Sequence, residues 1–322
     1  MTGDLDVRGF CDKIINNIEK VIVGKRTTIE YAVIGLLCQG HLLIEDVPGI
    51  GKTMLARSLA RSLGVTFGRI QFTPDMLPSD VTGVSIFNQV KREFEFRAGP
   101  VVAQIVLADE INRATPKTQA ALLEAMEERQ VTVDGVTHLL PKPFMVLATQ
   151  NPIEYEGTFP LPEAQLDRFL MRIRLGYPEL EDEIKILEDQ QYQHPLISLD
   201  FVVSLDEILH AQEKIKDVYI APSLKRYIIT LARQTRIHPE IYLGVSPRGS
   251  LALFRTSQAY ASMMGRNYVL PDDIKSLVVS TFAHRIILSP SARLRDFDSI
   301  QVVREIIENV AVPGGDFSVD HS

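Results

Sequence analysis

The fold of this chain is decided by the stretch Glu45-Asp46-Val47-Pro48-Gly49-Ile50-Gly51-Lys52-Thr53. An apolar run at residues 41–45 fits a strand buried on both faces, and a helical pattern continues from Thr53 to Leu63. A glycine-rich turn between such a strand and helix is typical of a phosphate-binding loop, because glycine lets backbone N–H groups point at phosphate oxygens. The helix N-terminus adds the positive end of its dipole. The stretch therefore predicts a nucleotide site.

Individual residues of this loop have distinct expected roles. Lys52 is expected to contact the β- and γ-phosphates of ATP, and the Thr53 hydroxyl to bind Mg²⁺. The usual pattern opens with glycine where this chain has Asp46, and a plain glycine turn beside an exposed lysine is the alternative interpretation. The strand and helix on either side favour the nucleotide site. The residues predicted to contact ATP here are Asp46, Pro48, Gly49, Ile50, Gly51, Lys52, Thr53 and Met54.

Two further apolar strands end in polar residues that suit the chemistry of hydrolysis. The first, residues 104–109, ends in Asp109 and Glu110, which predicts that Asp109 helps to hold Mg²⁺ and that Glu110 is the general base for the attacking water. The second, residues 144–149, is followed by Asn151, whose amide can orient that water. A solvated strand end and a turn before proline are the alternative interpretations. The occurrence of Asp109, Glu110 and Asn151 together with the upstream phosphate loop favours the catalytic interpretation.

Composition sets the broad class of the chain. Its 322 residues, 45% hydrophobic and 23% charged, describe a soluble globular protein with about two domains. A net charge of −7 argues against a dedicated nucleic-acid surface. No apolar run is long enough to span a membrane and residues 1–8 do not resemble a secretion signal, so we expect a cytoplasmic protein. The two cysteines, Cys11 and Cys38, are expected to be reduced core residues.

The order of patterns along the chain predicts two domains. Strands alternate with helices up to about residue 178, which predicts a three-layer α/β/α domain with a mainly parallel sheet over residues 1–178. Residues 85–96 and 130–140 alternate apolar and polar side chains around a turn, so we expect two inserted β-hairpins. Helical periodicity then dominates, which predicts an all-α lid domain over residues 179–322.

The order of these motifs resembles the AAA+ ATPases. Three segments, residues 109–114, 148–151 and 157–169, together resemble the MoxR family, and the likeness extends from about Val21 to Arg285. The resemblance implies that Arg168 is an arginine finger acting on a neighbouring subunit's nucleotide, and that Arg248 is a second sensor that contacts the γ-phosphate from the lid. For each arginine alone, a surface salt bridge is the alternative.

The same resemblance extends to the nucleotide's base and to the hairpins. It implies that Val23 and Gly24 pack on the adenine, although a simple break between helices explains the glycine as well. It also implies that both hairpins face a central pore. Three hairpin phenylalanines are then expected either to touch a client or to pack on the domain: Phe87, Phe94 and Phe96.

Taken together, the residues and the resemblance predict a Mg²⁺-dependent ATPase that acts as a hexameric, chaperone-like motor. Its implied task is to remodel or mature a protein complex or a metal-cofactor enzyme, and a protein with a von Willebrand factor A domain is an implied partner. A magnesium-chelatase-like motor subunit is the alternative within this class. A nucleic-acid motor and a nucleotide-binding scaffold without turnover are the alternatives outside it, and retention of Glu110, Asn151 and Arg168 disfavours the scaffold.

Overall fold

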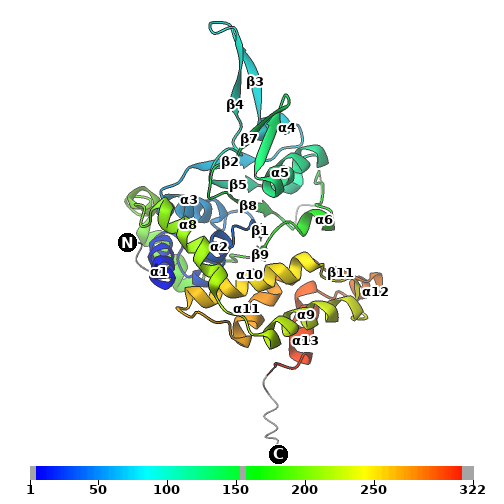
Figure 1. Cartoon of the computed structure of the whole chain (residues 1–322). Helices are drawn as coiled ribbons and strands as arrows, with labels where there is room; N and C mark the ends of the chain where they lie inside the picture. Colours follow the sequence, from blue (N-terminus) through cyan, green and yellow to red (C-terminus); the bar gives the residue numbers. More distant parts are fainter. Residues whose placement is uncertain (1–4, 153–156, 314–322) are drawn as a thin grey trace, which may run out of the picture.

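The computed structural model describes residues 5–152 and 157–313, and a five-stranded parallel sheet lies at its centre (Figure 1). The strand order is β2-β5-β8-β1-β9, and every neighbouring pair is parallel. The strands are β1 (Leu42–Glu45), β2 (Phe67–Gln71), β5 (Ile105–Asp109), β8 (Met145–Gln150) and β9 (Met171–Ile173). The edge strand β9 is not predicted by the sequence pattern, because three residues are too few to show a period.

Helices cover both faces of this sheet, which confirms the three-layer prediction. Successive residues of β1 enter different cores: Leu42 and Ile44 pack with α1, α2 and α3, whereas Leu43 packs with α5. This alternation is the period of two that a strand buried on both faces requires. The helices concerned are α1 (Val7–Glu19), α2 (Arg26–Leu37), α3 (Lys52–Leu63), α4 (Pro78–Thr82) and α5 (Pro116–Glu128).

Two β-hairpins project from the α/β domain, as predicted (Figure 1). They consist of β3 (Gly83–Asn88) with β4 (Glu93–Ala98), and β6 (Gln130–Val133) with β7 (Val136–Leu139). Asp134 and Gly135 both have positive φ, at 49° and 79°, which is the geometry of a type I′ turn. Phe96 stacks on His138 of the other hairpin with ring centroids 3.8 Å apart, whereas Phe87 and Phe94 are exposed.

The remainder of the chain is mainly helical. Ser204 and Glu207 form the capping box that begins α8. Two short strands, β10 (Ile241–Leu243) and β11 (Ile287–Leu288), form a small antiparallel sheet that the sequence pattern does not predict. The helices are α6 (Glu163–Leu166), α7 (Leu180–Asp189), α8 (Leu205–Lys214), α9 (Pro222–Ile237), α10 (Pro247–Met263), α11 (Pro271–Phe282), α12 (Pro290–Leu294) and α13 (Ser299–Asn309).

The helical lid is packed firmly on the α/β domain. Buried side chains of α8 to α11 and α13 belong to the same core as those of α1, α2 and α3. The Gln212 amide also donates a hydrogen bond of 2.7 Å to the Leu36 carbonyl. This packing fixes where α10 presents its side chains relative to the sheet. None of the helices in the described residues is both long and apolar enough to cross a lipid bilayer.

Candidate active site

The loop after β1 has the backbone geometry that phosphate binding requires. Gly49 and Gly51 have φ of +85° and +96°, values that strongly favour glycine. Gly51 is the N-cap of α3, and no side-chain hydrogen bond caps this helix among the described residues. Backbone N–H groups of its first turn are therefore available to an anion. The Lys52 ammonium lies in the same loop and donates a 2.7 Å hydrogen bond to the Asp46 carbonyl.

Asp46, which replaces the first glycine of the usual pattern, braces the loop. Its carboxylate accepts hydrogen bonds from the backbone N–H groups of Leu175 (2.8 Å) and Gly176 (2.7 Å), and from that of Val47 (3.0 Å). These contacts join the phosphate loop to the chain that follows β9. Because the Asp46 carboxylate is occupied by these hydrogen bonds, we expect Asp46 to contact the nucleotide through its backbone atoms rather than its side chain.

A cavity of about 460 Å³ opens beside this loop, a size typical of a small-molecule site. It lies between the α1–α2 connection, the phosphate loop and the segment of residues 176–194. Gly24 does not line it, but a Cβ at Gly24 would lie 1.8 Å from a carboxylate oxygen of Asp182, so α7 lies directly against this glycine. The predicted residues that the structure brings together around the cavity are Val23, Pro48, Gly49, Ile50, Gly51 and Met54.

The carboxyl ends of β1, β8 and β5 lie side by side at this edge of the sheet. Glu45 is level with Gln150, and Ala108 is level with Ala148, so β8 separates the phosphate loop from Asp109. Two strand spacings correspond to about 10 Å. Asn151, which directly follows β8, is 5% exposed, and β8 lies between β1 and β5 in the strand order. Ligands of open α/β sheets bind at such an edge.

Asp109 is held in place by Thr149, a residue that motif spacing does not reveal. The Thr149 hydroxyl donates a 2.7 Å hydrogen bond to Asp109 Oδ1 and accepts one of 2.9 Å from the Glu110 N–H. Arg69 of β2 lies 2.9 Å from Asp109 Oδ2. Thr149 and Arg69 reach Asp109 because β8 and β2 lie on either side of β5, an arrangement that the sequence alone does not reveal.

The Glu110 carboxylate is also engaged within the chain. Gln71 of β2 donates a 2.8 Å hydrogen bond to Glu110 Oε2, and Arg113 donates one of 3.0 Å to the same oxygen. Glu110 has φ of +57°, an unusual backbone conformation for a residue with a side chain. The predicted base therefore lies at the sheet edge in an orientation set by two polar neighbours.

The structure brings the two predicted arginines, Arg168 and Arg248, together around Glu127. Arg248 Nη2 lies 2.5 Å from Glu127 Oε1, and Arg168 Nε lies 3.9 Å from Glu127 Oε2. Arg168 also donates to the Leu123 carbonyl at 2.9 Å. Both arginine side chains are partly exposed, at 33% and 46%. They form one basic cluster on the surface.

This arginine cluster lies at the amino edge of the sheet, opposite the phosphate loop. Leu170, two residues after Arg168, donates a 2.7 Å hydrogen bond to the carbonyl of His41, which precedes β1. Arg129, two residues after Glu127, donates to the carbonyl of Phe144, which precedes β8. The phosphate loop follows the other end of β1. Neither arginine is therefore placed near the nucleotide cavity of its own chain.

Arg285 of the lid holds the main chain around Arg168. Its guanidinium donates to Asp167 Oδ1 at 2.8 Å and to the carbonyls of Phe169 and Leu170 at 2.5 Å and 3.1 Å. Burial lowers the pKa of Arg285 to about 10, which leaves it charged at neutral pH. Asp167 in turn accepts a 2.9 Å hydrogen bond from Ser246, the N-cap of α10. The hydrogen bonds between Arg285, Asp167 and Ser246 thus position the segments that carry Arg168 and Arg248.

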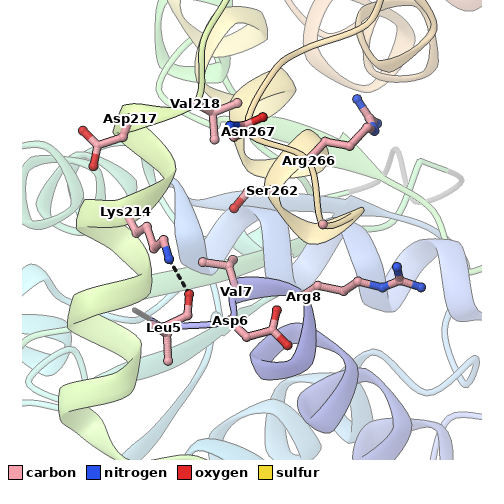
Figure 2. Close-up of a pocket in the computed structure, with 11 residues that line it drawn as sticks. Leu5, Asp6, Val7, Arg8, Lys214, Asp217, Val218, Ser262, Arg266 and Asn267 are labelled. Carbon is pink, nitrogen blue, oxygen red and sulfur yellow. Dashed lines mark hydrogen bonds between the residues drawn. The ribbon is translucent and has the colours of Figure 1, made fainter. Parts of the chain in front are cut away.

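A second cavity lies between the start of α1 and the lid (Figure 2). Its cationic side chains already have partners: Lys214 donates to the Leu5 carbonyl at 2.6 Å, Arg266 pairs with Asp273 at 2.6 Å, and Arg8 lies 3.8 Å from Asp12. Among the described residues, no group of three or more His, Cys, Asp or Glu side chains could hold a metal ion. The cavity beside the phosphate loop is the candidate active site, because residues predicted to contact ATP line it.

Comparisons with known proteins agree with this geometry. The family described as "ATPase family associated with various cellular activities (AAA)" matches residues 41–171, and the AAA lid domain matches residues 233–307. The chain is 39% identical to the Chaperone MoxR1 of Mycobacterium tuberculosis over 94% of this chain and 82% of that protein. It is 33% identical to Protein MoxR of Paracoccus denitrificans over 84% of this chain and 86% of that protein. The chain belongs to the MoxR family of AAA+ ATPases.

Two further relatives show how much of the MoxR-type chain is shared. An uncharacterized protein of Bacillus subtilis, YeaC, is 52% identical over 96% of both chains. A solved structure of a putative ATPase from Cytophaga hutchinsonii superimposes with a TM-score of 0.90 at 41% identity, over 95% of this chain and 96% of that one. Both the α/β domain and the lid therefore belong to the MoxR architecture.

Proposed function

We propose that this MoxR-type chain hydrolyses ATP at a site completed by a second copy of itself. The observation that carries the proposal is the separation of the two halves of the site: the phosphate loop and Asp109 lie at the carboxyl edge of the sheet, and Arg168 and Arg248 lie at the amino edge. The four residues of β1 alone span about 13 Å. The arginines therefore serve the nucleotide of a neighbouring subunit.

The donor atoms at the carboxyl edge fit Mg²⁺. Magnesium prefers oxygen ligands and keeps several waters, so one hydroxyl and one carboxylate suffice beside the phosphates of ATP. Thr53 in the first turn of α3 and Asp109, held by Thr149, supply these groups. Bound Mg²⁺ supplies positive charge that neutralises the phosphate oxygens.

Each remaining polar residue has a separate task in this proposal. Lys52 and the loop N–H groups hold the triphosphate, and Glu110 accepts a proton from the attacking water. Release of Glu110 from Gln71 and Arg113 frees its carboxylate for that step. Asn151 orients the water. Arg168 and Arg248 of the neighbour stabilise the charge that develops on the γ-phosphate.

At the level of biology, we propose a chaperone-like motor that remodels or matures a protein complex or metal-cofactor enzyme. The name of the M. tuberculosis relative supports a chaperone role. Heterologous contact between opposite faces of identical chains forms a ring when the rotation between neighbours closes, and we propose that it closes as a hexamer. Exposed Phe87 and Phe94 on the β3–β4 hairpin offer apolar contacts to a client, including a partner with a von Willebrand factor A domain.

The proposal is tested by steady-state ATP hydrolysis with and without Mg²⁺, together with nucleotide binding by calorimetry. Glu110→Gln should bind Mg²⁺-ATP but lose at least about a hundredfold in turnover, because the water loses its base. Lys52→Ala should weaken binding itself. Thr132→Val, on the exposed face of the β6–β7 hairpin, serves as the control. Normal turnover by Glu110→Gln would contradict the assigned role.

A further inference from the structure

One surface of α7 has no partner within the described chain. Leu180, Ile184 and Leu187, at positions i, i+4 and i+7, share one helix face, yet they are 72%, 43% and 71% exposed. No residue of α7 is buried. An exposed apolar stripe of this kind, on a helix in which no residue is fully buried, is the usual sign of a contact with another molecule.

The stripe on α7 is bordered by acidic side chains. Glu181 and Glu188 are seven residues apart and each directly follows a residue of the stripe, so they form a parallel acidic row. Both are exposed. Glu183 lies on the other side of the stripe. A matching surface must therefore combine apolar side chains with positive charges.

Such a surface exists on α10 and beside it. A cavity of about 540 Å³ lies between α2, α8 and α10, and its lining combines cations and apolar groups with no acidic residue. Leu251 and Phe254 supply apolar contacts, and Arg255 and Lys216 supply charge, although the exposed Lys216 also pairs with Glu213 at 2.6 Å. Leu251 is 46% exposed, and Arg255 is also exposed. We call this cavity with the exposed face of α10 the α10 surface.

The proposed shared active site brings α7 of one chain next to the α10 surface of its neighbour. Arg248 and Arg255 are seven residues apart on the same face of α10, which corresponds to about 10 Å along the helix. On the other chain, Glu183 and Leu187 of α7 line the same cavity as Gly49 and Gly51. An Arg248 side chain that reaches that cavity brings the same face of α10 beside the part of α7 that lines it.

We propose that α7 docks on the α10 surface of a second copy of this chain. The apolar stripe packs on Leu251 and Phe254, and the row of Glu181 and Glu188 faces Arg255 and Lys216. This inference rests on the proposed function, since the shared site sets the relative placement of the two chains. Its consequence is that the helix beside the nucleotide cavity is also a subunit contact, so nucleotide binding and assembly act on the same element.

Charge reversal tests the docking directly. We expect Glu181→Lys with Glu188→Lys to weaken ATP-dependent assembly, measured by analytical ultracentrifugation, about tenfold or more, because two attractive pairs become repulsive. Adding Arg255→Glu and Lys216→Glu in the same chain should restore assembly to within about threefold. Asp189→Lys is the matched control, since Asp189 is exposed on the opposite side of α7. Equal loss in this control, or no rescue by the second pair, would overturn the proposal.

Cross-linking tests the contact without relying on turnover. Ile184→Cys and Leu251→Cys chains, prepared separately and mixed, should give a cross-linked dimer with a short bismaleimide, whereas either chain alone should not. Both chains also carry Cys38→Ser, because Cys38 is only partly buried and lines the same cavity as Leu251, whereas the Cys11 thiol is buried. An absence of mixed dimers in a preparation that assembles would exclude this contact and leave the stripe to a client.

These outcomes separate the docking from the proposed function. If the charge reversals and cross-links fail while wild-type protein hydrolyses ATP with Arg168 acting between subunits, only the docking is wrong. If wild-type protein does not hydrolyse ATP but the mixed dimers form, the docking stands and the catalytic proposal fails.

Discussion

Arg285→Lys should separate catalysis from nucleotide binding. Arg285 is 2% exposed, and its guanidinium donates hydrogen bonds on both sides of Arg168, to Asp167 and to the carbonyls of Phe169 and Leu170. It also donates to the Thr281 carbonyl. Lysine keeps the positive charge but has three donors on one nitrogen, and it lacks the planar fork of arginine. The substitution therefore loosens the segment that carries Arg168 without removing Arg168 itself.

The expected size of the effect follows from these contacts. Arg285 donates five hydrogen bonds and lysine has only three donors, so at least two bonds are lost. Each bond involving a charged group contributes about 1.5–3 kcal/mol, so the loss of two corresponds to about 3–6 kcal/mol of stability. Displacement of a catalytic group by about 1 Å costs about a hundredfold in rate. The Kd for ATP should stay within about twofold, because the cavity lies at the opposite edge of the sheet.

The assay is steady-state hydrolysis together with fluorescent-nucleotide binding and thermal unfolding. Arg295→Lys is the matched control, because Arg295 is 54% exposed and pairs with Glu240 on the lid surface. Such surface pairs contribute about 0–1 kcal/mol. A variant with lowered Tm but unchanged kcat would refute the positioning role of Arg285. Parallel loss of binding and kcat would refute the separation of the two edges.

Two further predictions concern Thr149 and the buried histidine His41. Thr149→Val should raise the Mg²⁺ concentration needed for half-maximal hydrolysis by about tenfold, because Asp109 loses a charge-assisted hydrogen bond. Thr137→Val on the exposed β7 is the control. An unchanged Mg²⁺ titration for Thr149→Val would contradict the role of Thr149. Burial, together with the nearby charge of Arg129, lowers the pKa of His41 to about 3, so His41 is neutral in the folded state at neutral pH. Its contribution to the free energy of unfolding is therefore present above pH 6.5 and is lost as the pH falls toward 3. Urea unfolding should show a loss of about 2 kcal/mol from this residue between pH 6.5 and 5, and a His41→Asn variant with an equally steep pH dependence would exclude the effect.

Features set by local chemistry could be predicted from the sequence. The phosphate loop, the apolar strands and the Asp134-Gly135 turn each depend on neighbouring residues, and the structure confirms these elements. The ends of β2, Phe67 and Gln71, could not be predicted from local sequence. Its ends are set by residue-for-residue pairing with β5, which is a long-range property.

The arrangement of the candidate site depends equally on long-range contacts. Gln71 reaches Glu110 because β2 lies next to β5, and no spacing along the chain encodes that order. Arg168 and Arg248 are 80 residues apart in the sequence. They meet at Glu127 only because the lid packs on the α/β domain. Motif resemblance identified both arginines. The sheet topology places them at the amino edge of the sheet, opposite the phosphate loop.

The central claim, an active site shared between two chains, is tested most directly by mixing two inactive variants. Lys52→Ala lacks the phosphate contact and Arg168→Ala lacks the finger, so neither should hydrolyse ATP alone. In an equal mixture, about one quarter of the subunit contacts join an intact phosphate loop to an intact Arg168, and hydrolysis should return in proportion. Hydrolysis that stays absent in mixed assemblies of verified composition, or Arg168→Ala that is fully active alone, would contradict the account.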